Sequence, residues 1–194
     1  IKPGLNMGIT GRDLVLEKIL AIGDFTAGKV CEVCEIRAGQ AAKMSLLGRD
    51  EDFDWQNNYF RPRGSKIITS YPQLTRAFVI PALANYLARQ LVVEVVDGKV
   101  ESFVKNLDFP STASGVDLVR SGKTAAEFGL RTVGDPILKS WPALYRSSEV
   151  GSEMNLVIDA IAFLKAKITE AGLALVEGSG SNPQKNLQMW KKPF

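Results

Sequence analysis

The chain has 194 residues, 45% of them hydrophobic and 23% charged, which is enough for one medium domain or two small lobes with buried cores. A net charge of +3 is too small an excess to indicate nucleic-acid binding, and no apolar run approaches the roughly 20 residues of a membrane span. The sequence contains no histidine, which excludes His-based catalytic triads, His-ligated metals and imidazole acid–base chemistry.

The N-terminal part of the chain alternates strand and helix patterns. A short strand over 4–10 leads through a turn into a helix around Leu14–Ile19, and residues 29–37 follow as a second strand. Residues 38–64 are rich in Gly, Asp, Asn and Pro and show weak periodicity. We therefore expect a long loop or a crossover between two lobes there.

Cys31 and Cys34 have the spacing of a metal-binding or redox pair. A structural zinc site normally needs four Cys or His ligands, and no companions are present. On a regular strand, positions i and i+3 point to opposite faces, which would separate these two thiols. The pattern predicts two reduced, structural cysteines in a cytoplasmic protein.

A strand over Lys66–Thr69 precedes a helix that opens at Tyr71–Arg76, with proline tolerated in its first turn. Apolar residues recur every four positions along this helix and predict a buried stripe. Pro81 should kink the helix or divide it. The stripe comprises Leu74, Phe78, Ala82 and Tyr86.

The remaining chain continues the alternation, which favours an α/β fold. Glycines at the ends of several segments are natural stops. The expected elements are a strand over Leu91–Val96, a turn-rich approach over Ser111–Gly115, a strand over Val116–Val119, a helix from Thr124 to about Phe128, a strand near 143–146, a long helix over Glu153–Ala171 capped by Ser152, and a solvated tail from Ser179.

The segment Asp117–Thr124 has the composition of a phosphate-binding turn. A β-branched strand runs into Arg-Ser-Gly-Lys-Thr, where a helix begins. Gly122 allows a tight turn that exposes consecutive backbone N–H groups, and a helix N-terminus adds partial positive charge. Ser121 and Thr124 add hydroxyl donors, and Lys123 adds a cation. The turn therefore suits a phosphate monoester.

Asp117 distinguishes this turn from a nucleoside-triphosphate P-loop. A P-loop requires glycine five positions before Gly122, and that position holds Asp117. A carboxylate at a strand end is instead well placed to accept hydrogen bonds from ribose hydroxyls. The pattern favours binding of a phosphorylated ribose, and an ordinary strand–turn–helix connection is the alternative.

Five segments, in order, resemble motifs of the ATP phosphoribosyltransferases, the enzymes that open histidine biosynthesis. Short motifs match by chance, but their order and spacing together are specific. Gly4–Asp13 resembles D-L/F-G-I-T-G-x-D, Lys66–Arg76 resembles R-I-A-T-x-Y-P-N-L-x-R, Gly98–Glu101 is similar to G-x-V-E, Asp117–Thr124 matches D-x-V-x-[ST]-G-x-T, and Gly134–Arg146 resembles the segment that leads out of the same lobe.

The resemblance implies a two-lobed, periplasmic-binding-protein-like (type II) α/β fold with the active site in the cleft. Residues 1–37 would be part of a first lobe that we expect to be incomplete, and 38–64 the crossover. Residues 65–143 would form the second lobe, and 144–194 would return to the first lobe with the long helix and the tail.

The resemblance also implies an activity: Mg²⁺-dependent attack of adenine N1 of ATP on C1 of phosphoribosyl pyrophosphate, which releases pyrophosphate. It implies a homo-oligomer or a hetero-complex with a regulatory chain. The expected site residues are Ser121, Gly122, Lys123 and Thr124 on the 5′-phosphate, Asp117 and Glu101 on the ribose hydroxyls and Mg²⁺, and Thr10, Gly11, Arg12 and Asp13 on the opposite wall of the cleft.

The sequence departs from the family pattern in several places. The family carries a further basic segment before the motif at Gly4–Asp13, and the run before Asp117 lacks an acidic position that the family usually has there. Arg120 stands where the family often has Glu or Gly. Two alternatives therefore stay open: a non-catalytic ligand-binding or regulatory relative that keeps the phosphate loop, and a structural subunit of a larger assembly. Arg12 as a surface arginine and Glu101 as an exposed strand-end carboxylate are the corresponding alternatives at single residues.

Overall fold

The computed structural model has a mixed α/β fold made of two compact units. One unit contains the described residues up to Ala41 and from Ser140 onward, and the other contains those of Ala42–Lys139. The chain therefore passes between the units twice. The structure describes residues 7–22, 29–54, 59–60, 66–84, 91–106, 113–149 and 154–178.

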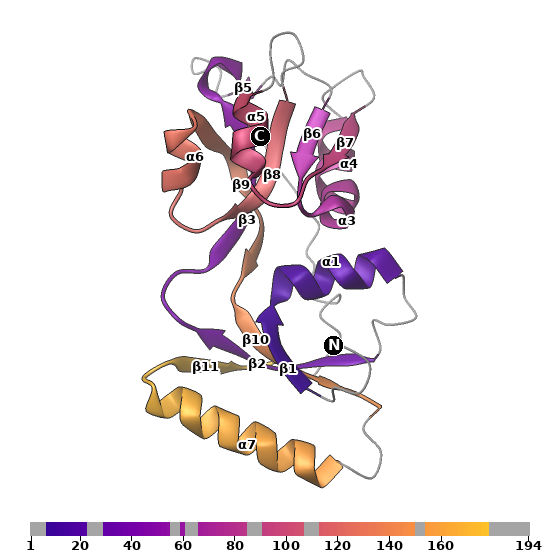
Figure 1. Ribbon diagram of the computed structural model, residues 1–194, viewed down its shortest axis with the longest axis vertical. Helices are drawn as coiled ribbons and strands as arrows, with labels where there is room; N and C mark the ends of the chain where they lie inside the picture. The colour runs from indigo at the N-terminus through magenta and orange to yellow at the C-terminus, as the bar shows by residue number, and fades with distance from the viewer. Residues whose placement is uncertain are drawn as a thin grey trace. The chain divides into compact units, whose positions relative to one another are not determined.

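The first unit is built on a four-stranded antiparallel sheet in the order β1-β10-β2-β11. In Figure 1, the helix α7 lies below these strands and α1 above them. The strands are β1 (Met7–Gly11), β2 (Val30–Arg37), β10 (Pro142–Ser147) and β11 (Ala174–Glu177), and the helices are α1 (Arg12–Ile22) and α7 (Met154–Glu170).

The core of the first unit lies at the two central strands. Cys34 and Leu144, which face each other across β2 and β10, are fully buried, and α1 adds Leu16 and Ile19. The long helix α7 was predicted closely, but it buries little: Val157 is buried while Leu156 is 70% exposed. Gly172, with a φ of 73°, ends the helix as expected. Ser152, the expected cap, lies outside the described residues.

A β-bulge in β2 changes which residues share a face. Leu144 pairs with Cys34, and the next residue of β10, Tyr145, pairs with Glu32. One residue of β2 between these two pairs is left without a partner in β10. Two residues of β2 that are three apart, one on each side of this bulge, therefore lie on the same face of the sheet. The strand itself was predicted correctly, but the expectation that Cys31 and Cys34 point to opposite faces is wrong. Both cysteines are free, and burial raises the pKa of the Cys34 thiol.

The second unit is built on a five-stranded sheet in the order β7-β6-β8-β3-β9. The strands β7, β6 and β8 run parallel, and β3 runs antiparallel to β8. The strands are β3 (Ala42–Arg49), β6 (Lys66–Thr69), β7 (Val92–Val95), β8 (Ala113–Val119) and β9 (Leu130–Ser140), and a separate pair is formed by β4 (Phe53–Asp54) and β5 (Tyr59–Phe60).

Short helical segments connect these strands. Figure 1 shows α5 and α6 beside the sheet strands β8 and β9. The segments are a 3₁₀ turn (Asp50–Asp52), α3 (Pro72–Leu74), a π-helical turn (Thr75–Val79), α4 (Ile80–Ala84), α5 (Val100–Asn106) and α6 (Lys123–Glu127). Leu47, Ile68, Val100, Val104, Ala125 and Leu130 form the core that joins α5 and α6 to the sheet.

The expectation of a loop over 38–64 is wrong for most of its described residues. The strand β3 occupies Ala42–Arg49, between β8 and β9. The consecutive residues Met44–Leu47 are buried, so this strand is covered on both faces and lacks the polar–apolar alternation that marks a half-exposed strand. Met44, Ser45, Leu46 and Leu47 are all buried.

The helical segment after Tyr71 is divided by a π-helical turn that ends two residues before Pro81, in agreement with the expected division of the helix. The turn Thr75–Val79 is π-helical, and the N–H of Ile80 donates to the carbonyl of Thr75. A π-helical turn contains one residue more than an α-helical turn. This wider turn accommodates Pro81, which has no N–H to donate to the carbonyl four residues earlier. The buried apolar positions are therefore Leu74, Val79 and Leu83, in place of the predicted Leu74, Phe78 and Ala82; Tyr86 lies outside the described residues.

Other elements agree or differ in detail. The strand Lys66–Thr69 is confirmed, but β8 already begins at Ala113, so that the turn-rich approach expected up to Gly115 is wrong there. The strands β9 and β11 and the helix α5 were not predicted. Among the described residues, no helix is both long and apolar enough to cross a membrane.

Candidate functional site

Three connections meet at one edge of the sheet in the second unit. The parallel strands β6, β7 and β8 all end at this edge, and each is followed by a short connection into a helical segment. Ligands of open α/β sheets bind in the crevice outside the carboxyl ends of such strands. These connections contain Ser70, Gly98–Lys99 and Arg120–Gly122.

Asp117 lies in β8, two residues before the last residue of the strand at this edge. One carboxylate oxygen, Oδ1, accepts a hydrogen bond of 2.7 Å from the backbone N–H of Leu118. Burial raises the pKa of Asp117, and the negative charge of Glu101 raises it further, against the hydrogen bonds from Leu118 and the Ser70 side chain that lower it. A carboxylate that is desolvated but oriented can accept hydrogen bonds from hydroxyl groups or bind a cation.

Glu101 comes from the first turn of α5. Gly98 and Lys99, with φ values of 66° and 53°, turn the chain sharply from β7 into this helix. Glu101 therefore lies on a helix, and its alternative interpretation as a strand-end carboxylate is wrong. Glu101 is near enough to Asp117 for its negative charge to contribute to the raised pKa of that carboxyl group.

The predicted phosphate loop follows Asp117 directly. Gly122 has a φ of 75°, a left-handed conformation that glycine adopts without strain, and it precedes the first residue of α6. The N–H of Lys123 donates to the Ser121 hydroxyl oxygen at 3.4 Å, and the side chains of Ser121, Lys123 and Thr124 are exposed. Because α6 has five residues, its dipole is small, and the loop's own N–H and side-chain groups are its main donors.

Arg12, by contrast, is occupied by carboxylates of its own unit. Its Nη2 and Nε bond the two oxygens of Glu32 at 2.6 and 3.1 Å, and its Nη1 lies 2.8 Å from Oε1 of Glu35. The bulge in β2 places Glu32 and Glu35 on one face, where both are buried. Burial alone would lower the pKa of Arg12, but these carboxylates raise it. Arg12 is not the surface arginine of the alternative interpretation.

The neighbours of Arg12 also belong to the first unit. Thr10 and Gly11 pair with β10, opposite Ala143 and Pro142. Asp13 is 3% exposed, and its Oδ1 accepts a hydrogen bond of 2.5 Å from the Ser140 hydroxyl. The other six predicted site residues lie in the second unit.

Sequence reasoning missed two hydroxyl residues beside Asp117. Thr69 ends β6 with no solvent exposure, and Ser70 follows it. The side chain of Ser70 forms a hydrogen bond with Asp117. Both residues lie in Lys66–Arg76, which was recognised as a motif but given no role. The parallel pairing of β6 with β8 is the information that the sequence did not provide.

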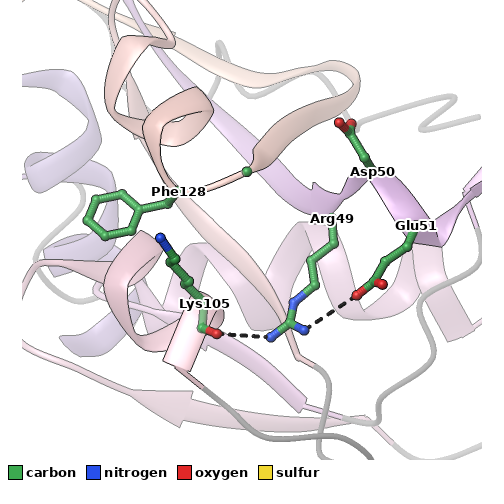
Figure 2. A pocket seen from close by; sticks show the side chains of 6 residues that line it. Arg49, Asp50, Glu51, Lys105 and Phe128 are labelled. Carbon is green, nitrogen blue, oxygen red and sulfur yellow. Dashed lines mark hydrogen bonds and ion pairs between the residues drawn. The ribbon is translucent and has the colours of Figure 1, made fainter.

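A shallow hollow of about 270 Å³ lies elsewhere in the second unit and contains none of the predicted site residues. Figure 2 shows Arg49 in it, directed at the carbonyl of Lys105 and at the carboxylate of Glu51. Arg49 also donates to the carbonyl of Val104 at 2.6 Å, so its guanidinium caps the C-terminal end of α5. The ammonium of Lys105 stacks 5.4 Å from the Phe128 ring. Arg49 is thus engaged in holding α5, and Asp50 of the hollow pairs with Arg131 of β9.

The donor set limits what metal the site can hold. Within the described parts of the chain, no three Cys, Asp or Glu side chains are grouped as metal ligands. Asp117 and Glu101 form a carboxylate pair of the kind that contributes two ligands to a hard cation. A cation at this pair would need further oxygen ligands from a bound substrate.

The fold is that of an α/β protein in which a strand bearing Asp117 runs into a left-handed glycine turn at this edge of the sheet. A family model described as ATP phosphoribosyltransferase (HisG) matches residues 2–166. The chain therefore belongs to the ATP phosphoribosyltransferase family.

Individual relatives agree with this assignment. The chain is 30% identical over 161 residues to the ATP phosphoribosyltransferase of Corynebacterium jeikeium, covering 81% of this chain and 50% of that protein. It is 27% identical over 169 residues to that of Schizosaccharomyces pombe, with the same coverage of 81% and 50%. The chain spans about half the length of these curated relatives.

A solved structure shares the fold. The ATP phosphoribosyl transferase (HisG:HisZ) complex from Thermotoga maritima matches with a TM-score of 0.59 at 19% identity, over 87% of this chain and 70% of that chain. At this identity the match supports the fold of the chain, and the function has to be argued from the residues.

Proposed function

We propose that this chain carries the phosphoribosyl site of an ATP phosphoribosyltransferase. The reaction transfers the phosphoribosyl group of phosphoribosyl pyrophosphate to N1 of ATP and releases pyrophosphate, as the first step of histidine biosynthesis. The observation that carries the proposal is the continuous segment Asp117–Thr124, in which an oriented carboxylate precedes a left-handed glycine and exposed hydroxyl and ammonium groups.

The residues divide the substrate between them. Ser121, Gly122, Lys123 and Thr124 bind the 5′-phosphate, because a turn of exposed N–H and O–H donors with one cation complements a phosphate monoester. Asp117 and Glu101 accept hydrogen bonds from the ribose hydroxyls. As the bond from C1 to pyrophosphate breaks, positive charge develops on the sugar ring, and the two carboxylates stabilise it. The enzyme otherwise acts by holding the two anionic substrates in reacting position.

Mg²⁺ fits the carboxylate pair. Burial raises the pKa of Asp117 and the negative charge of Glu101 raises it further, and a divalent cation held by both carboxylates would offset that repulsion. When bound with the substrate, Mg²⁺ neutralises charge on pyrophosphate and makes it a better leaving group. Its remaining ligands would be oxygens of the substrate and water.

The finer fold and assembly are part of the same proposal. We infer a two-lobed, periplasmic-binding-protein-like (type II) fold in a cytoplasmic protein, with Thr10–Asp13 as further substrate-binding residues. Arg12 is paired with the carboxylates of Glu32 and Glu35, which compensate its positive charge. It would therefore contribute to substrate binding only through its shape and through N–H groups on one edge of its guanidinium. A regulatory chain or further copies of this chain would complete the enzyme, in keeping with the HisG:HisZ title of the Thermotoga maritima complex.

Calorimetric titration with phosphoribosyl pyrophosphate tests the site. The double change Lys123→Ala with Thr124→Ala should weaken binding by about 10- to 100-fold, because it removes a charged and a neutral hydrogen-bond donor. The matched control is Lys167→Ala with Thr169→Ala on the exposed face of α7, which should leave the affinity unchanged.

A product assay for phosphoribosyl-ATP, with any partner chains present, separates the alternatives. Product formation that falls with the loop variant supports the enzyme. Tight binding without product would identify a non-catalytic relative that keeps the phosphate loop. No binding of phosphoribosyl pyrophosphate by the parent chain and its partners would leave a structural subunit and overturn the proposal.

A further inference from the structure

Asp117 lies on a face of the sheet that changes from apolar to polar in one step. The row Leu47, Gly115 and Ile68 runs across β3, β8 and β6 and is covered by α5. Two residues further along these strands, toward the carboxyl end of β8, the pairing places Ser45 opposite Asp117, and Ser70 follows the last paired residue of β6. A polar row, Ser45–Asp117–Ser70, therefore borders the core where the site begins.

Thr69 connects the end of β6 and the turn that follows it to β8 through its hydroxyl group. The Thr69 hydroxyl, Oγ1, donates a hydrogen bond of 2.9 Å to the carbonyl oxygen of Val116, and Val116 directly precedes Asp117. The same oxygen accepts the N–H of Tyr71 at 2.9 Å and the hydroxyl of Thr75 at 3.1 Å. One donor and two lone pairs are all a hydroxyl has, so the group is fully used.

The surroundings make this hydrogen-bonding centre rigid. Thr69 and Thr75 are both fully buried, and Thr75 begins the π-helical turn and accepts the N–H of Ile80 on its own carbonyl. The centre thus fixes the strand β8, the turn at Ser70 and the first turn of the helical segment to one another. A buried hydroxyl or N–H group that loses its hydrogen-bond partner destabilises the fold. The observed hydrogen bonds are therefore strongly preferred over arrangements that would leave these groups unpaired.

We propose that Thr69 is a positioning residue of the phosphoribosyl site: its hydroxyl locks the turn after β6 onto β8, so that Ser70 stands beside Asp117 and holds that carboxylate in its binding orientation. The inference rests on the proposed function for the identity of the ligand, and it gives a role to the motif at Lys66–Arg76. Ser70 is the group that touches Asp117, and Thr69 and Thr75 act through it.

The orientation of Asp117 can be read without any ligand. The N–H of Leu118 donates to Asp117 Oδ1, so the chemical shift of the Leu118 amide proton reports where that oxygen lies. In the full chain, Thr69→Val keeps the shape of the side chain and removes the hydroxyl, Thr69→Ser keeps the hydroxyl, and Ser70→Ala removes the group that touches Asp117. Thr169→Val on α7 is the matched control, since it removes a hydroxyl that bonds only its own helix in the first unit.

We expect the Leu118 amide resonance to move in Thr69→Val and in Ser70→Ala, and to stay near its original position in Thr69→Ser and Thr169→Val. A lower melting temperature alone would not distinguish the role, because any buried hydroxyl can stabilise the fold. If Thr69→Val does not fold, Ser70→Ala still decides, because Ser70 is only partly buried. An unmoved Leu118 resonance in Ser70→Ala, or in a folded Thr69→Val, would overturn the inference.

Affinity for phosphoribosyl pyrophosphate provides the second readout. The dissociation constant should rise about 10-fold in Thr69→Val and Ser70→Ala, as expected for one misplaced hydrogen-bonding group, and return to within about threefold in Thr69→Ser. Unchanged affinity in the first two variants would contradict the inference while leaving the proposed function standing. Absence of binding by the parent chain and its partners would refute the proposed function, and the Leu118 resonance would still decide whether Thr69 orients Asp117.

Discussion

At the scale of single residues, Arg12 shows how a partner can override a pattern. An arginine at the start of a helix, beside a glycine turn, suits an anion-binding role. Its guanidinium instead bonds both oxygens of Glu32, which also accepts the Tyr145 hydroxyl at 3.1 Å. Only the bulge in β2 aligns Glu32 with Glu35, and no pattern in the sequence marks it. The alternation of a regular strand predicts that Glu32 and Glu35 point to opposite faces.

Removing Arg12 should destabilise the first unit strongly. Arg12→Met leaves the buried Glu32 carboxylate without its cation and leaves Glu35 with only the longer pair to Arg37 at 3.4 Å, and we expect the free energy of unfolding to fall by about 3–5 kcal/mol in urea denaturation. Adding Glu32→Gln and Glu35→Gln should restore most of this loss, because the uncompensated charges disappear. Lys167→Met, which breaks an exposed pair with Glu170, should cost less than about 1 kcal/mol. Equal small losses from both single variants would show that Arg12 does not hold the unit together.

At the scale of elements, α5 is placed by a close approach and by a cap. A Cβ atom at Gly115 would come within 2.9 Å of Val100 Cγ1 and 3.1 Å of Val104 Cγ2, so β8 accepts the helix only because this residue is glycine. At its other end, Arg49 caps the carbonyl of Val104. These two features fix the position of the helix that carries Glu101.

Gly115→Ala should therefore disturb both the fold and the site. We expect a loss of about 1–3 kcal/mol of unfolding free energy, the usual cost of overpacking, with weaker binding of phosphoribosyl pyrophosphate as α5 moves away. Val104→Ala in the same chain should recover part of the affinity by making room. Gly8→Ala in β1, where a Cβ would meet no heavy atom within 4 Å, is the control for adding a methyl group to a strand. Tight binding by Gly115→Ala alone would mean that the position of α5 does not govern the site.

Elements with a one-sided pattern or clear end signals could be predicted from the sequence, and others could not. Lys66–Thr69 is bounded by turn residues, and Met154–Glu170 ends at a glycine, so both were expected. The strand β3 is buried on both faces, and α5 is too short to show a period. Within the candidate site, the phosphate loop follows from local chemistry. The contact of Ser70 with Asp117 depends on strand order, which local sequence does not encode.

At the scale of the whole molecule, the two units differ in how the chain builds them. The first combines residues up to Ala41 with residues from Ser140 onward, whereas the strands and helices described for the second all come from the single segment 42–139. That segment contains a five-stranded sheet, a buried core and all six residues assigned to the phosphate loop and the carboxylate pair. A contiguous segment with its own core can fold as a domain.

We therefore expect residues 42–139, produced alone, to unfold cooperatively in urea and to bind phosphoribosyl pyrophosphate within about 10-fold of the affinity of the full chain, since the contacts to ribose and 5′-phosphate lie inside it. ATP should bind more weakly to this segment than to the full chain, because Thr10–Asp13 are absent from it. The same segment with Lys123→Ala and Thr124→Ala is the control for specific binding. A segment that folds but binds no phosphoribosyl pyrophosphate, while the full chain does, would show that the first unit supplies an essential contact to that substrate, and Thr10–Asp13 would be the first residues to exchange.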